Sequence, residues 1–483
     1  LGAAIASFAI RGRNKKLRCV AMGLAAIATL PTQAFAQPAR PNIIMLLADD
    51  LGWTETSVQM HPDIPESKSD YYQTPNIAAL AASGMKFSSA YAGPLCTSTR
   101  AALITGKSPA QLQMTDVLNG PALDATRYQG GATSFALATP IVRGALPKSE
   151  TTIAEYLHSN APGYKAANFG KWHLSLPENG LNAMQPGYDF DAEHIGQWGL
   201  SADQDPKGNF SANLSGMRFM EQRVTANTPF YLQMSYTLPH APFQYRPQTL
   251  AKYQALPPGE RHYLPQQAAM IDDLDTLIGQ VMAKVNQLGI ADNTYIVVSS
   301  DNNAHELLAP SENAPLFHFK GSVYEGGTRV PMIVVGPGIN ANVNSTVPVM
   351  LQDVFATVSS IAGITQPLDS NIESANLLPL LHNGGVLPQG TPALSRGFAP
   401  NGEVFTHMPH YTGTGRVPAS SVLDGDFKLV KVYGENSQPD KVMLFNLAQN
   451  ITESDNPASP LNIASQYPEK TSQLLARLDQ WIV

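Results

Sequence analysis

Cysteine is scarce in this 483-residue chain, which contains only Cys19 and Cys96. We expect Cys19 to be removed with an N-terminal segment, and Cys96 then has no partner for an intramolecular disulfide. Charged residues are also few, at 14% against about 25% in an average globular protein. The formal net charge is −7, so the chain has no overall positive field to attract nucleic acid or another polyanion. Any anion site must therefore depend on positive charge that is gathered locally.

Long apolar runs are lacking too, because no stretch reaches the ~20 residues that a membrane span needs. The nearest candidate, residues 19–30, follows five basic residues between positions 11 and 18 and precedes Ala34-Phe35-Ala36. This order is typical of a secretory signal peptide, with an N-terminal anchor as the alternative. We therefore predict a signal peptide over residues 1–36 and an exported protein, periplasmic or extracellular, without a membrane span. Its removal takes the net charge from −7 to −12, since the segment carries five basic and no acidic residues.

Strand-like and helix-like patterns alternate through most of the chain. Helices are predicted from Thr74-Pro75 to Gly84, over 151–158 and over about 266–288, where apolar residues repeat every three or four positions. This alternation predicts an α/β fold with a large, mostly parallel central sheet flanked by helices. The expected strands are short apolar runs at residues 42–48, 165–169, 294–300 and 330–335.

The pattern changes near residue 390. Hairpin strands are predicted within 422–432 and 443–447, followed by a final helix over 471–482. We therefore expect a main domain over residues 37–390 and a small α+β subdomain over residues 391–483. Two long segments rich in turn-forming residues, 107–150 and 176–228, exceed ordinary connection lengths and are predicted to be loops that face a binding site.

Two predicted strands end in oxygen-bearing side chains. Asp49 and Asp50 follow the first strand, and Asp301 and Asn302 follow the strand over 294–300. In open parallel sheets, ligands bind beyond the carboxyl ends of the strands. Four such oxygen donors suit Ca²⁺, with Mg²⁺ as the alternative, and not zinc. A helix cap or turn is the simpler interpretation of an isolated Asp-Asp pair.

Cys96 directly precedes a predicted helix over residues 97–105 that Gly106 ends. The N-terminus of a helix offers free N–H groups and a positive dipole, which favour an oxyanion. Arg100 lies one turn into the helix and can return to the same point with several donors. A buried, unreactive thiol is the alternative interpretation of a lone cysteine.

Four further basic residues are weak signals when taken singly. Lys171 and His173 follow the strand over 165–169, and strand alternation predicts that both point to one side. His240 lies between two prolines, and Lys320 precedes a Gly-Gly turn.

Together and in this order, these motifs resemble the type I, formylglycine-dependent sulfatase family of the alkaline phosphatase superfamily. The resemblance extends over residues 41 to about 455. It implies the alkaline phosphatase-like fold with a small C-terminal subdomain and a catalytic main domain. The motifs that carry it are residues 48–53, the Cys96 signature over 94–107, residues 170–174, His240, residues 300–302, residues 320–331, residues 425–429 and residues 444–447.

The resemblance also implies a role for each candidate residue. Cys96 would be oxidised to formylglycine by a maturation enzyme, and its hydrate would attack the sulfur of a sulfate ester. His240 would donate a proton to the leaving alcohol, and His173 would take a proton when sulfate is expelled. The other expected residues are Asp49, Asp50, Asp301 and Asn302 around Ca²⁺, Arg100 and Lys171 beside the nucleophile, and Lys320 on the sulfate.

Three positions depart from the family pattern. Ser98 stands where the modification signature has Pro or Ala, Asn303 replaces a glycine, and Ser175 replaces another. Asn tolerates left-handed backbone better than most residues, so we expect the turn at Asn303 to survive.

The leading hypothesis is a sulfuric ester hydrolase that acts on a sulfated polysaccharide or oligosaccharide. One alternative is an arylsulfatase or a phosphate or phosphonate monoester hydrolase. Another, suggested by Ser98, is an unmodified protein that only binds sulfated glycans. Residues 407–411 are a candidate for sugar contacts, with a packed turn as the other interpretation.

Overall fold

The computed structural model describes residues 40–118, 137–175, 185–190, 200–305, 310–412 and 417–482. The predicted signal peptide lies outside these ranges and stays a prediction. Within the described part of the chain, every helix is too short or too polar to cross a membrane.

A large sheet forms the centre of the fold, and it is mostly parallel, as predicted. Strand β1 lies in its middle, pairs in parallel with β5 and β6, and is buried along its whole length. Strand β7 pairs antiparallel with both β6 and β2, and it begins at Met332, two residues after the expected start. In the described chain the order is β4 (Lys165–Gly170), β5 (Phe230–Pro239), β1 (Asn42–Asp49), β6 (Thr294–Ser300), β7 (Met332–Val335), β2 (Met85–Phe87) and β8 (Val343–Ser345).

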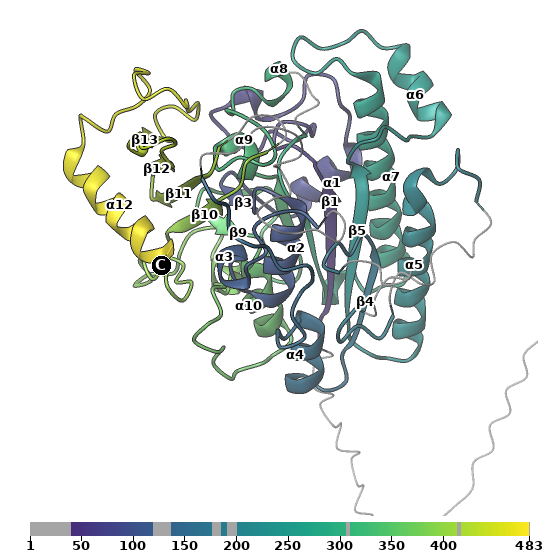
Figure 1. The fold of residues 1–483 in the computed structure, drawn as a ribbon. Coiled ribbons are helices and arrows are strands. Elements are labelled where there is room, and N and C mark those ends of the chain that lie inside the picture. The colour runs from purple at the N-terminus through teal and green to yellow at the C-terminus, as the bar shows by residue number, and fades with distance from the viewer. Residues whose placement is uncertain are drawn as a thin grey trace, which may run out of the picture. The chain divides into compact units, whose positions relative to one another are not determined.

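Helices cover both faces of this sheet, which explains the continuous apolar sequence of β1 (Figure 1). Alternate residues of the strand enter different cores: Ile43 and Met45 face one, and Ile44 and Leu46 face the other. The first core is covered by α2 (Cys96–Thr105), α4 (Ile153–Asn160), α10 (Asp353–Ile361) and α11 (Leu378–His382). The second is covered by α1 (Pro75–Ser83), α5 (Asn209–Thr225), α6 (Pro247–Gln254) and α7 (Pro265–Gln287).

Local sequence explains two of the helix ends and fails to explain a third. Thr152 caps α4 in a reciprocal capping box with Glu155. Gly106 ends α2 with φ 68°, and its N–H bonds the carbonyl of Ala102. Thr74 does precede α1, but its side chain accepts from the N–H of Ser57 and does not cap the helix.

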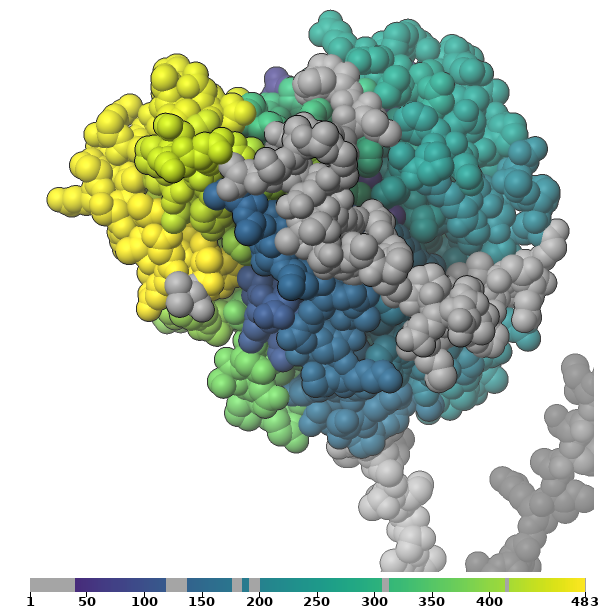
Figure 2. Space-filling model, in the orientation of Figure 1, coloured from purple at the N-terminus to yellow at the C-terminus, as the bar shows by residue number. Residues whose placement is uncertain are grey.

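The C-terminal residues form a separate antiparallel sheet with one long helix, so the predicted α+β character is confirmed. The segment 422–432 contains two strands joined at Gly425, which has φ 58°. The first strand of this sheet was not predicted from the sequence. Figure 2 shows these residues, in yellow, at one side of the molecule. The elements are β10 (Val404–Met408), β11 (Ala419–Asp424), β12 (Phe427–Val432), β13 (Lys441–Asn446) and α12 (Pro468–Ile482).

One face of this second sheet packs on α12 through Leu474 and Leu478. The opposite face contacts Leu95 and Tyr324, which lie next to candidate site residues. The domain boundary near residue 390 stays a prediction. Short elements complete the described chain: β3 (Ala90–Tyr91), β9 (Val349–Met350), α3 (Pro109–Leu112), α8 (Pro310–Asn313), α9 (Glu325–Thr328) and the 3-10 turns η1 (Pro65–Ser67), η3 (Pro206–Gly208) and η4 (Ala291–Asn293).

Candidate active site

The four predicted metal ligands meet at one edge of the central sheet. Strands β1 and β6 are parallel neighbours, and Ala48 pairs with Ser300, so both strands end at the same level. The N–H of Asp50 donates to Asp301 Oδ1 at 3.3 Å, and Asn302 Nδ2 donates to Asp50 Oδ1 at 2.7 Å. All four side chains, Asp49 included, are buried.

Several oxygens of this group lack a hydrogen-bond partner although they are buried. They are Asp49 Oδ1, Asp50 Oδ2 and Asn302 Oδ1. Burying an acceptor without a partner is costly, and such groups need a donor, a water or an ion. Burial and the nearby carboxylate of Asp49 raise the pKa of Asp301 to about 6. A hard divalent cation fits this set of oxygen donors.

Each carboxylate of this cluster also contacts a cationic side chain. Lys171 Nζ lies 2.7 Å from Asp49 Oδ2, and Lys320 Nζ lies 2.6 Å from Asp50 Oδ1. Burial raises the pKa of Asp49, but attraction to Lys171 and Arg100 outweighs it and holds the pKa below its usual range. Lys320 has the same effect on the pKa of Asp50. These aspartates are therefore ionised at neutral pH.

Arg100 and His240 also lie beside the carboxylate cluster. The Nε of Arg100 donates to Asp301 Oδ2 at 2.8 Å, and one of its terminal nitrogens donates to the carbonyl of Lys171 at 2.8 Å. His240 Nε2 lies 3.7 Å from Asp50 Oδ2. The local positive charge required by an acidic chain is thus present at one sheet edge.

Cys96 is the first residue of α2, and its side chain is buried beside His173. The Sγ atom lies 3.3 Å from His173 Nδ1, while His173 Nε2 lies 3.1 Å from the carbonyl of Leu118. A carbonyl only accepts, so Nε2 carries the ring proton and Nδ1 can accept from the thiol. Burial, with repulsion by Lys171 and Arg100, lowers the pKa of His173 to about 3. The imidazole ring of His173 is therefore uncharged at neutral pH.

The nucleophile position and the carboxylates share one small volume. Ligand atoms of Asp49, Cys96 and Asp301 lie within 4.8 Å of one another, and so do those of Asp49, Asp50 and His240. Burial raises the pKa of the Cys96 thiol, so the unmodified side chain is a poor nucleophile.

The structure brings together every predicted site residue, but the stated reason for one pair is wrong. Strand β4 ends at Gly170, and His173 has a left-handed backbone with φ 59°. Strand alternation therefore does not orient Lys171 and His173, which reach the site from a turn.

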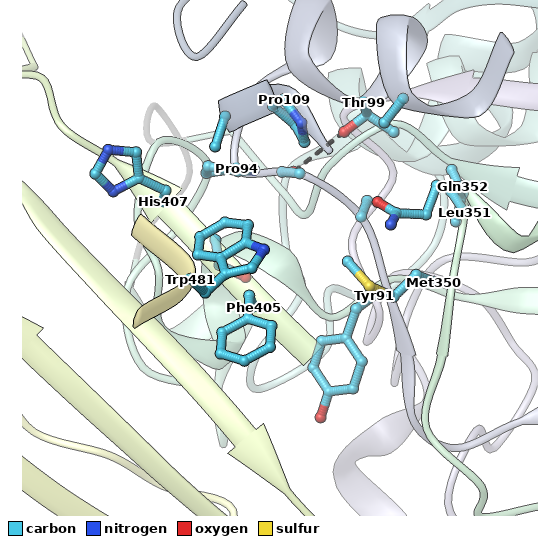
Figure 3. A pocket seen from close by; sticks show the side chains of 15 residues that line it. Tyr91, Pro94, Thr99, Pro109, Met350, Leu351, Gln352, Phe405, His407 and Trp481 are labelled. Carbon is cyan, nitrogen blue, oxygen red and sulfur yellow. Dashed lines mark hydrogen bonds between the residues drawn. The ribbon is translucent and has the colours of Figure 1, made fainter. Parts of the chain in front are cut away.

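The structure also bears on the predictions for Asn303 and for segment 407–411. Asn303 is not among the residues with positive φ, so no left-handed turn is formed there. Most of segment 407–411 is packed: His410 bonds Thr115 at 2.8 Å, and Tyr411 bonds Glu435 at 2.6 Å. Its first residue, His407, lines a pocket together with the stacked rings of Phe405 and Trp481 (Figure 3).

The sulfatase family model matches residues 41–364. The chain is a member of the sulfatase family. It is 30% identical over 399 residues to N-acetylgalactosamine-6-sulfatase of Mus musculus, covering 75% of this chain and 70% of the relative. A sulfatase of Formosa agariphila is 26% identical over 528 residues, covering 92% and 89%. This sulfatase is therefore a sulfuric ester hydrolase.

Solved structures show the same fold at lower identity. Ps i-CgsB in complex with k-i-k-neocarrahexaose has a TM-score of 0.68 at 23% identity and covers 92% of this sulfatase and 93% of that chain. BT4656 in complex with D-glucosamine-2-N,6-O-disulfate has a TM-score of 0.68 at 20% identity, with coverage of 91% and 97%. These matches confirm the predicted architecture.

Proposed function

We propose that this sulfatase removes sulfate from a sulfated saccharide, with Cys96 as the precursor of its nucleophile. The observation that carries the proposal is the position of Cys96 within 4.8 Å of Asp49 and Asp301, surrounded by cationic side chains. The saccharide is supported by the curated relative named N-acetylgalactosamine-6-sulfatase and by the disulfated glucosamine bound to BT4656.

Asp49, Asp50, Asp301 and Asn302 would hold the metal ion, which we propose is Ca²⁺, with Mg²⁺ as the alternative. Their unpartnered oxygens supply hard donors at the carboxyl ends of two strands. When bound, the ion supplies positive charge that neutralises a sulfate group. Lys171, paired with Asp49 and close to Cys96, would donate to the nucleophile, and Lys320, paired with Asp50, would donate to a sulfate oxygen.

Conversion of Cys96 to formylglycine by a maturation enzyme would supply a hydrated aldehyde, whose hydroxyl is the nucleophile toward sulfur. Arg100 is fixed by Asp301 and by the carbonyl of Lys171, so its position next to residue 96 is defined before substrate arrives. His173, neutral and with Nδ1 facing residue 96, can accept a proton from it. His240, on the Asp50 side of the site, can donate a proton to the leaving alcohol.

Two other substrate classes are retained as alternatives to a sulfated saccharide. Arylsulfatase A of Homo sapiens is 28% identical over 404 residues, which favours an aryl sulfate as the second substrate class. Phosphonate monoester hydrolase of Agrobacterium radiobacter shares the fold, with a TM-score of 0.61.

Export to the periplasm or the cell exterior is also part of the proposal. It depends on the basic and apolar pattern of residues 1–36, which a secretory signal would explain.

The test compares sulfate release by the wild type and Cys96→Ala, produced in the native host. We expect release from sulfated oligosaccharides by the wild type alone, with slower turnover of nitrophenyl sulfate and of nitrophenyl phosphate. Mass spectrometry of the peptide containing residue 96 should detect the aldehyde. An intact thiol throughout, with equal release from both proteins, would contradict the proposal.

A further inference from the structure

Lys207 lies next to the active site, within the segment 176–228 that was predicted to be a loop facing a binding site. The loop prediction is wrong for much of this segment, because residues Asn209–Thr225 form helix α5. Lys207 belongs to η3, directly before α5. Asp205 holds the start of that helix by accepting from the N–H of Phe210 at 2.7 Å. Asn209 is tied to the end of β5, since its amide exchanges bonds of 2.9 Å with the N–H and the hydroxyl of Thr237. The segment is therefore fixed against the strand that leads to His240.

The backbone of Lys207 is left-handed, with φ 55° and ψ 22°. For a residue with a side chain this conformation costs about 1–2 kcal/mol, and it persists where surrounding contacts impose it. Here it directs the side chain toward the site, and the ammonium donates to the carbonyl oxygen of His240.

Lys207 differs from the other lysines in the site in the groups that contact its ammonium. Lys171 and Lys320 each form an ion pair with an aspartate of the metal cluster. Among the described residues, Lys207 has no carboxylate within ion-pair distance. Burial lowers its pKa to about 8, while Asp49 and Asp50 act in the opposite direction. The side chain is thus largely protonated at neutral pH, and the charged groups that act on it belong to the active site.

An ammonium has three N–H donors, and the bond to His240 uses one of them. The other two are available to an acceptor that approaches from the open side of the site, because the residue is partly exposed. An anionic oxygen is the acceptor that a cation without a counter-ion binds most strongly.

We propose that Lys207 is a substrate-binding residue whose ammonium binds an anionic oxygen of the sulfated saccharide. The inference rests on the proposed function, in which the substrate is such a saccharide. The oxygen belongs either to the sulfate that is cleaved or to a second acidic group on the sugar, and the experiment separates these two sources.

The experiment measures binding and needs no turnover, so it stays informative if sulfate release fails. Calorimetric titrations would use N-acetylglucosamine 6-sulfate, with one anionic group, and D-glucosamine-2-N,6-O-disulfate, with two. The proteins are the wild type, Lys207→Met, Lys207→Arg and Lys252→Met. Lys252 is the matched control, because it lies on α6 and pairs with Asp272 at the surface.

We expect Lys207→Met to weaken binding by about tenfold to a hundredfold, Lys207→Arg to restore most of it, and Lys252→Met to leave it unchanged. Weaker binding of both sugars assigns the contact to the cleaved sulfate. Weaker binding of the disulfated sugar alone assigns it to the second group. Unchanged affinity for both sugars in Lys207→Met, or no binding of either sugar by the wild type, would overturn the proposal.

Discussion

Lys428 of β12 and Glu325 of α9 form a buried ion pair of 2.7 Å. The same ammonium lies 3.0 Å from Glu453, and Glu325 also pairs with Arg329. The segment that includes Glu325 carries Lys320 a few residues earlier. The C-terminal sheet therefore supports a part of the chain that reaches the active site.

Lys428→Met should destabilise the protein strongly. The substitution keeps most of the aliphatic stem but leaves the buried carboxylate of Glu453 without its cation and Glu325 with Arg329 alone, at a cost of about 3–5 kcal/mol. Lys431→Met is the control from the same strand, since its partners Asp440 and Asp479 are exposed and the loss should stay below about 1 kcal/mol. Urea unfolding measures both. Equal losses in the two variants would contradict a special role for the buried pair.

Asn303→Gly should also destabilise, although glycine is the residue usual in the family at this position. The side-chain oxygen Oδ1 of Asn303 accepts from the N–H of Ala304 at 2.7 Å and from the N–H of Trp53 at 3.2 Å. The side-chain nitrogen Nδ2 donates to the backbone carbonyl of Arg329. Removing the side chain leaves buried donors unpaired, at about 1–3 kcal/mol. Thermal unfolding would show this, with the exposed Asn340→Gly as control. A stability at or above that of the wild type would refute the role of the side chain.

Calcium should raise the unfolding temperature of the wild-type protein and not that of Asp49→Asn. An ion that binds only the folded state stabilises it by about 2.7 kcal/mol at a hundred times its Kd. Asp272→Asn, on the surface of α7, should keep the full calcium effect. Calorimetric melting with calcium, magnesium and chelator tests this. A calcium-induced shift that survives in Asp49→Asn would place the ion elsewhere.

Stability should fall as the pH decreases from about 6.5 to about 4, in part because of His262. Burial lowers the pKa of His262 to about 4, so the unfolded chain binds a proton in this range while the folded protein does not. For a shift of this size the loss is about 3 kcal/mol at pH 4. Urea unfolding of His262→Gln should show a shallower pH slope, whereas the exposed His382→Gln should keep the wild-type slope. Identical slopes for all three proteins would rule out this contribution.

The sequence predicted what depends on short stretches of chain. Apolar runs that end in Asp49 and Asp301 identify two strands and the candidate metal ligands that follow them. Cys96 with Arg100 identifies the helix that lies between these strands in the sequence. The features that were missed depend on contacts between distant segments. Lys207 meets His240 only because η3 packs on the end of β5. The side-chain amide N–H groups of Asn303 find their acceptors only when α9 lies beside them. His173 lies beside Cys96 as predicted, but the predicted reason is wrong, because His173 follows the end of strand β4 and has a left-handed backbone.

Every residue of α2 is buried, and Cys96 is 1% exposed. Another protein cannot bind residues 96–100 as an extended peptide once this helix is packed. If Cys96 is converted as proposed, the enzyme that oxidises it must meet the chain before the surrounding layers close. Refolding an unconverted polypeptide would then yield a correctly shaped protein that later exposure to the same enzyme leaves inactive.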